Sequence, residues 1–283
     1  MSEGTAAPRS LARERWRVAL RSATLLTGLA ILGFWVVCAL FGARIAPQDP
    51  YADNLLATLA PPSAAHLFGT DQLGRDILSR VIIGARDILI VAPLATLLGT
   101  VLGTSLGLAI GYLRGPLDDL VSRVIEAVQA LPLVIVALMA LAAVGTSNDT
   151  VVLVIGFVFT PLIARTVRSA VLVESDLDYV PAARLRGDGA LAIMFIEILP
   201  NVLPIVAVEM TVRLGYAIFF VASLSFIGFG IQPPSADWGI AIAENYSLIG
   251  SYWWTVVFDA GATASLVIGV NLVTDGLASV FET

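Results

Sequence analysis

Long apolar runs separated by short polar segments dominate the pattern of this sequence. The first run is uncharged from Ser22 to Ala43. At about 1.5 Å per residue it can cross the roughly 30 Å of hydrocarbon in a bilayer. Five further apolar stretches cover residues 88–113, 124–145, 150–167, 200–230 and 254–274. The pattern therefore predicts an all-α, polytopic membrane protein with six transmembrane helices.

Composition agrees with this pattern. Hydrophobic residues make up 58% of the 283 residues, and charged residues only 13%, about half the share of an average soluble domain. A chain with so few polar side chains cannot cover the surface of a soluble globule. The bilayer must be the solvent for most of it.

Arginine placement predicts the orientation. Five arginines precede the first run, and positive charge next to a first helix favours the cytoplasmic side. The run also exceeds the roughly 7–15 apolar residues of a cleavable signal peptide, so we expect it to be retained. The predicted segments are a cytoplasmic tail (1–22), a first transmembrane helix (23–43), an extracytoplasmic segment (44–87), a core of five helices (88–277) with a cytoplasmic loop at 168–199, and a C-terminal tail (278–283). Both termini are then cytoplasmic.

The rare residues exclude several classes of chemistry. All 16 basic residues are arginine, so the chain lacks the lysine of a Walker A nucleotide-binding loop. His66 is the only histidine and Cys38 the only cysteine, which excludes a zinc site of His and Cys ligands and an intrachain disulfide. Ser105 lies in a formal match to a hydrolase nucleophile elbow, but it falls mid-helix, far from the sole histidine. We therefore expect no catalytic site, metal or cofactor in this chain.

Four glycines in the second run are spaced four residues apart. In a helix this spacing places them on one stripe, where another helix can approach closely. The sequence therefore predicts helix packing at Gly99, Gly103, Gly107 and Gly111.

Charged residues inside the runs are candidates for pore contacts. Glu209 and Arg213 stand four apart on one helical face and can pair. An unpaired charge at bilayer depth costs at least ~2.5–3.5 kcal/mol on insertion scales. Either the two form a structural pair against neighbouring helices, or they contact a charged or zwitterionic substrate. Arg123 and Glu126 are expected to pair as well, and the remaining pore or substrate candidates are Ser223, Ser225 and Asp259.

The polar segment at 168–199 predicts a helix, a break and a second helix between two membrane spans. Asp178 can cap the first helix, and Pro181 would lie in its first turn, where a missing N–H is harmless. Gly187 and Gly189 would end it, and the second helix would start before Pro200. Such an element suits docking against a soluble partner, although a solvated connecting loop is the usual alternative.

This segment resembles the EAA motif of ABC-importer permeases. The matching residues are Ala182, Ala183, Gly187, Leu199, Pro200 and Asn201. Pro181 replaces the glutamate of the motif, and Glu197 stands where peptide importers often have histidine. The resemblance implies a helix that couples to an ATPase, with the candidate residues Asp178, Tyr179, Pro181, Ala182, Ala183, Arg184, Arg186, Gly187 and Asp188.

Further motifs, in the same order along the chain, are similar to C-type subunits of the dipeptide/oligopeptide (peptide/nickel) transport family. They are His66–Arg80 with Gly84–Arg86, Ala222–Pro234, Asp237–Gly239, and Asn271–Leu272 with Asp275–Leu277. The resemblance implies a type I importer permease fold in a bacterial inner membrane. It also implies a homologous B-type permease, two ATP-binding subunits that hold ATP and Mg²⁺, and an extracytoplasmic solute-binding protein as partners. Membrane lipid would surround the chain, and no nucleic acid is expected.

A secondary transporter or channel that acts alone is the second interpretation, because several acidic residues in the runs could relay protons. An inverted internal repeat would favour it, and none is visible. A membrane-embedded enzyme is the third, and it lacks a usable triad or metal set.

Overall fold

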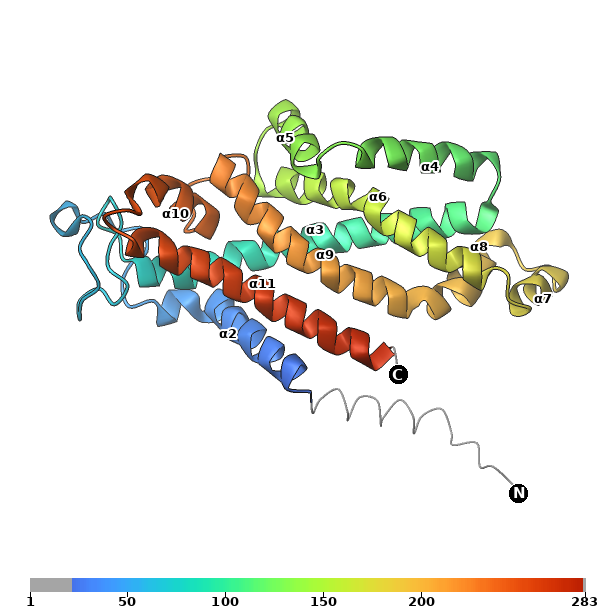
Figure 1. Ribbon diagram of the computed structural model, residues 1–283, viewed down its shortest axis with the longest axis horizontal. Helices are drawn as coiled ribbons and strands as arrows, with labels where there is room; N and C mark the ends of the chain where they lie inside the picture. Colours follow the sequence, from blue (N-terminus) through green and yellow to red (C-terminus); the bar gives the residue numbers. More distant parts are fainter. Residues whose placement is uncertain (1–21, 282–283) are drawn as a thin grey trace, which may run out of the picture.

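The computed structural model describes residues 22–281, and all regular elements within that range are helices. The predicted N-terminal tail and the end of the predicted C-terminal tail lie outside the described residues. The long helices run side by side along the longest axis of the molecule (Figure 1). We call the two ends of this bundle the α7 end, at the right of Figure 1, and the α10 end, at its left.

Five described helices are long and apolar enough to cross a membrane: α2 (Ala23–Ile45), α3 (Ile77–Leu113), α6 (Asn148–Glu174), α9 (Leu199–Ile227), which continues the turns from Ala190, and α11 (Trp254–Phe281). A sixth span results if α4 (Pro116–Gln129) and α5 (Leu133–Val144) are counted together. The predicted all-α fold with apolar spans is confirmed.

The run at 124–145 is not the single straight helix that we expected. The axes of α4 and α5 meet at 91°. Pro132 lies at the break, where it has no N–H to donate and disfavours a helical conformation of Leu131. Figure 1 shows α4 lying along α6 and α5 at a steep angle to α4, and both helices contact α6.

Two element boundaries also differ from the apolar pattern. Helix α3 begins at Ile77 rather than at 88, because Asp76 accepts a hydrogen bond from the Ser79 N–H (2.9 Å) and caps it. Residues 77–87 of the predicted outer segment are therefore helical. At the other end, α6 continues to Glu174, so residues 168–174 belong to a helix rather than to the predicted loop.

Short elements close both ends of the bundle. At the α7 end, α7 (Tyr179–Leu185) and α8 (Ala190–Ala192) are followed by a π-helical turn over Ile193–Ile198, which leads into α9. At the α10 end lie α10 (Trp238–Asn245) and two 3₁₀ turns, Leu55–Ala57 and Tyr246–Leu248.

The centre of the bundle is the close contact between α3 and α6. A Cβ added at Gly107 would lie 2.7 Å from the carbonyl oxygen of Ala164, and one at Gly103 would lie 2.7 Å from the Ile163 Cβ. Gly99 and Gly111 meet α6 in the same way, at 3.0 and 2.9 Å. The predicted packing stripe is confirmed, and its partner is α6.

Candidate functional site

Helix α7 starts without the predicted cap. The Asp178 side chain makes no capping hydrogen bond, so that part of the prediction is wrong. Pro181 does lie in the first turn, where its missing N–H leaves no bond unmade. The helix ends as predicted at Gly187 (φ +84°). The N–H groups of Gly187 and Asp188 donate to the carbonyls of Arg184 and Ala183, which is a Schellman C-cap.

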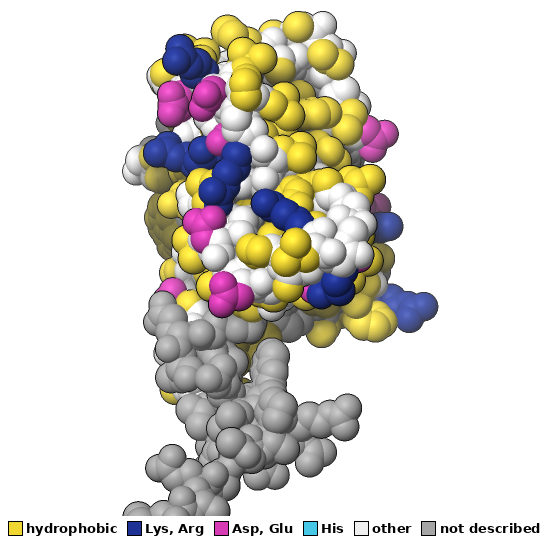
Figure 2. All heavy atoms as spheres, turned by 90° about the vertical axis from the view of Figure 1, so that its right-hand side faces the viewer, with side chains coloured by type: hydrophobic (Ala, Val, Ile, Leu, Met, Phe, Trp, Pro, Cys, Tyr) yellow, Lys and Arg dark blue, Asp and Glu magenta, His cyan; other side chains and the backbone are white. Residues whose placement is uncertain are grey.

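One face of α7 is buried and the other is open. Val180 and Ala183 are fully buried, whereas Pro181, Ala182, Arg184 and Leu185 are exposed. Leu185 exposes 90% of its surface. Figure 2 views this end of the molecule and shows hydrophobic side chains between clusters of arginine and acidic side chains. Large exposed apolar side chains with a charged surround are typical of a surface that binds another protein.

Polar contacts tie α7 to three spans. The Tyr179 hydroxyl donates to Glu174 on α6 (2.8 Å) and accepts from the side chain of Asn201 on α9 (3.2 Å). Burial raises the pKa of this hydroxyl. Arg184 donates through Nε to the Tyr112 hydroxyl on α3 (3.2 Å), with its guanidinium 4.9 Å from the ring centroid. Helix α7 therefore has polar contacts with α3, α6 and α9.

Arg186 bridges the break that follows α7. Its Nη2 donates to Asp188 (2.8 Å) and to Glu197 in the π-helical turn (2.5 Å). The two carboxylates, Asp188 foremost, raise the pKa of the Arg186 guanidinium. Glu197, which departs from the motif of peptide importers, thus has a partner in this chain.

Glu209 and Arg213 form the ion pair that their spacing predicts. Arg213 donates through Nε and Nη2 to one carboxylate oxygen of Glu209, at 2.7 and 2.5 Å. The side chains are 13% and 19% exposed. The guanidinium also lies 5.7 Å from the ring centroid of Tyr216. The pair is largely self-neutralised within α9.

Replacing either member of this pair alone is expected to cost more than replacing both. Glu209→Gln or Arg213→Gln leaves one charge unpaired within a span, whereas the double variant removes both charges. We expect an interaction energy of about 0.5–3 kcal/mol in a double-mutant cycle on the free energy of unfolding in detergent. Additive single effects would contradict the structural role. Unchanged uptake by the double variant would remove a role in substrate contact.

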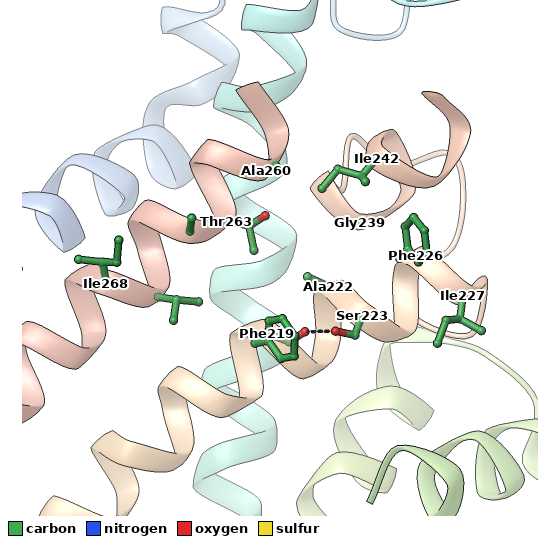
Figure 3. A pocket seen from close by; sticks show the side chains of 12 residues that line it. Phe219, Ala222, Ser223, Phe226, Ile227, Gly239, Ile242, Ala260, Thr263 and Ile268 are labelled. Atoms are coloured by element: carbon green, nitrogen blue, oxygen red, sulfur yellow. Dashed lines mark hydrogen bonds between the residues drawn. The ribbon is translucent and has the colours of Figure 1, made fainter. Parts of the chain in front are cut away.

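A groove of about 600 Å³ opens between α9, α10 and α11. Figure 3 shows Phe219, Ser223 and Phe226 of α9 facing Ala260 and Thr263 of α11 across it. Its walls are almost wholly apolar. The Ser223 hydroxyl lies in the wall but donates to the Phe219 carbonyl (2.8 Å), the dashed line in Figure 3.

The other two pore candidates are buried. Ser225 and Asp259 are each 2% exposed, and neither lines the groove. The Ser225 hydroxyl accepts the N–H of Ile231 (3.0 Å) and fixes the turn after α9. Ser225 and Asp259 are thus buried within this chain, whereas Ser223 lies in the wall of the groove. A pore contact of any of the three stays a prediction.

A polar layer between α4 and α6 was missed by the sequence analysis. Arg168 donates through Nε and Nη2 to the carboxylate of Asp118, at 2.6 and 2.7 Å. Arg165 donates to the side chain of Gln129 (3.1 Å). Within residues 22–281, Arg123 and Glu126 do not form the ion pair that we expected. The partners are far apart in the sequence, so no local spacing signals them.

The family described as binding-protein-dependent transport system inner membrane component matches residues 99–283. The chain belongs to this family. The N-terminal transmembrane domain of oligopeptide transport permease C matches residues 10–62. Together the two regions cover most of the chain, including α2 and the predicted core from residue 99 onward.

Similar proteins over the full length are peptide permeases. The dipeptide transport system permease protein DppC of Escherichia coli K12 is 39% identical over 281 residues, 97% of this chain and 94% of its own length. The di/tripeptide permease protein DppC of Pseudomonas aeruginosa UCBPP-PA14 is 35% identical over 276 residues, 95% of this chain and 91% of its own. The probable D,D-dipeptide permease DdpC of E. coli K12 is 32% identical over 288 residues, 100% of this chain and 97% of its own.

The resemblance to C-type permeases of peptide ABC importers is confirmed. This family member is a pore-forming subunit in the inner membrane and not an enzyme, and the ATPase is a separate subunit. The stand-alone transporter and the membrane enzyme are thereby set aside.

Proposed function

We propose that this chain is the C-type permease of an ATP-driven importer of dipeptides or oligopeptides, and that α7 is its coupling helix. The peptide class is supported by the similar proteins that act on dipeptides and tripeptides. Coupling is supported by α7, which exposes Ala182 and Leu185 outward while its other face contacts three spans.

The proposal orients the molecule. The α7 end and both termini lie in the cytoplasm, and the α10 end faces the solute-binding protein. The other partners are a homologous B-type permease and two ATP-binding subunits that hold ATP and Mg²⁺. This chain supplies half of the pore and needs no cofactor of its own.

In the proposed cycle, ATP binding closes the pair of ATPase subunits, and this closure displaces α7. Because Tyr179 and Arg184 connect α7 to α6, α9 and α3, the displacement is transmitted to the spans. The pore then turns from inward-facing to outward-facing and accepts peptide from the binding protein. Pro181 makes this contact apolar where the motif glutamate would make it polar.

Ala182→Trp tests this proposal. We expect at least a tenfold loss of ATP-driven peptide uptake in proteoliposomes containing all subunits, because the indole separates α7 from the ATPase surface by more than an atomic diameter. The ATPase subunits should also co-purify less well. Gly187→Trp is expected to act in the same direction, but its φ of +84° adds backbone strain.

Ala43→Trp, on the exposed surface of α2, is the matched control and should transport normally. Unchanged uptake and unchanged ATPase binding in Ala182→Trp would refute the assignment of α7. Uptake without any ATPase subunit would refute the importer itself.

A further inference from the structure

Arg165, in α6, has no carboxylate partner among the described residues. Arg165 lies nine residues before the end of α6, about 13 Å along the helix axis at 1.5 Å per residue. Its side chain is exposed on this chain. No acidic side chain in residues 22–281 forms an ion pair with it. It is therefore a charged group within a candidate span that has no counter-charge among the described residues.

The exposed side chain of Arg165 within a span indicates contact with water or protein rather than with lipid. A charged side chain in a span faces the bundle interior or an aqueous cavity, because contact with hydrocarbon is too costly. Arg123 and Glu126, on the neighbouring helix α4, are exposed and without an ion-pair partner among the described residues as well. We infer that this face of α4 and α6, which also exposes Leu120 and Val124, contacts water or another subunit rather than lipid.

The Arg165 guanidinium has one hydrogen-bond partner among the described residues, on α4. Its Nη1 donates to the Gln129 side-chain oxygen (3.1 Å), and the Gln129 side-chain nitrogen donates to the Pro161 carbonyl (3.3 Å). Helix α4 thereby contacts the Arg165 guanidinium through Nη1 alone. The edge formed by Nε and Nη2 remains free of partners in the described chain.

That free edge is the one that binds carboxylates in this protein. One turn further along α6, Arg168 uses Nε and Nη2 to hold Asp118, at 2.6 and 2.7 Å. Arg213 uses the same two nitrogens for Glu209. The planar fork matches a carboxylate in geometry and charge. The Nε and Nη2 edge of Arg165 has no protein partner among the described residues.

We propose that Arg165 binds the carboxylate of a peptide as it passes through the pore, with Gln129 as the residue that positions it. The inference rests on the proposed peptide importer and adds a substrate contact within the membrane to it. Every linear peptide with a free C-terminus carries such a carboxylate, so the contact is independent of side chains. Such a contact would allow the transport of peptides that differ in their side chains.

The single, buried cysteine allows a charge-rescue experiment. Arg165→Cys is made in a Cys38→Ala background and assembled with cysteine-free partner subunits in proteoliposomes. The new thiol is modified with 2-aminoethyl methanethiosulfonate, which adds an ammonium, or with the 2-sulfonatoethyl reagent, which adds an anion. Uptake of a free-acid dipeptide and ATP hydrolysis are both measured. Arg44→Cys, at the exposed end of α2, is the matched control.

We expect Arg165→Cys to lose uptake about tenfold or more, as is usual when a hydrogen bond to a charged group is removed, while assembly and ATP hydrolysis persist. The ammonium should restore much of the uptake, and the sulfonate should restore none. Equal rescue by both reagents, or no loss of uptake, would overturn the proposal. Failure of the subunits to assemble would also overturn it, and would assign Arg165 to a carboxylate of the sister permease. If the complex with the unsubstituted chain takes up no peptide, the proposed function fails instead.

Discussion

Gly107→Leu is expected to prevent stable packing of α3 against α6. Even a Cβ at this position would meet the Ala164 carbonyl oxygen at 2.7 Å and the Val167 Cβ at 2.8 Å. Both atoms belong to the backbone or lie next to it on a buried helix, so neither can move aside. Overpacking of this kind costs about 3 kcal/mol or more when the backbone must shift. We expect a large fall in the unfolding midpoint of the purified chain in detergent.

Gly33→Leu is the control for this experiment, because Gly33 lies on the helix α2 and has no atom within 4 Å of an added Cβ. It changes the same residue type in the same secondary structure. Helix propensity alone would raise both midpoints, because Leu favours a helix more than Gly does. A midpoint that falls equally in both variants would therefore show that contact with α6 does not decide the result. A normal midpoint for Gly107→Leu would contradict the close approach itself.

Asp118→Ala has the second largest expected effect. The variant leaves Arg168 without its carboxylate, and loss of one partner from a buried pair costs about 3–5 kcal/mol. We expect the lower end of that range, because the Arg168 side chain is 30% exposed. Helix α4 should loosen from α6, which limited proteolysis within residues 114–132 would detect.

Two further variants test whether the effect of Asp118→Ala comes from the unpaired Arg168. Asp176→Ala removes the partner of Arg114 in a pair that is 46% and 70% exposed, and should cost less than about 1 kcal/mol. The double variant Asp118→Ala with Arg168→Ala should be more stable than Asp118→Ala alone, since no charge is then left unpaired. If it is not, the unpaired guanidinium is not the cause of the loss.

The apolar spans could be predicted from the sequence because hydrocarbon imposes a length and a composition on any helix that crosses it. The glycine stripe could be predicted as well, because its spacing is local. The start of α3 could not be read from hydropathy. Arg80 and Asp87 make residues 77–87 look like a polar loop, but Arg80 is buried and the Ser235 hydroxyl donates to Asp87 (2.5 Å). Asp76 was the available signal, as a capping residue before a helix.

The coupling segment also has some features that could be predicted from the sequence and some that could not. Its helix end could be predicted from Gly187, since glycine readily adopts the positive φ of a Schellman cap. The roles of Glu197 and Arg165 could not. Each depends on a partner on another element, Arg186 and Gln129, and sequence spacing does not encode which helices lie together. The bend between α4 and α5 could be predicted only in part, because Pro132 signals a break in the helix but not the angle of that break.

The π-helical turn over Ile193–Ile198 has a geometric consequence for the rest of α9. A wide turn holds more residues than an α turn, so every later side chain is rotated about the helix axis relative to an uninterrupted α-helix, by roughly 100° for one extra residue. The direction in which Arg213 and Phe219 point around the helix axis is therefore set at the start of α9, in the turn that contains Glu197. Deleting one residue from this turn would turn a different set of α9 side chains toward the groove, although none of the residues that now line it would be substituted.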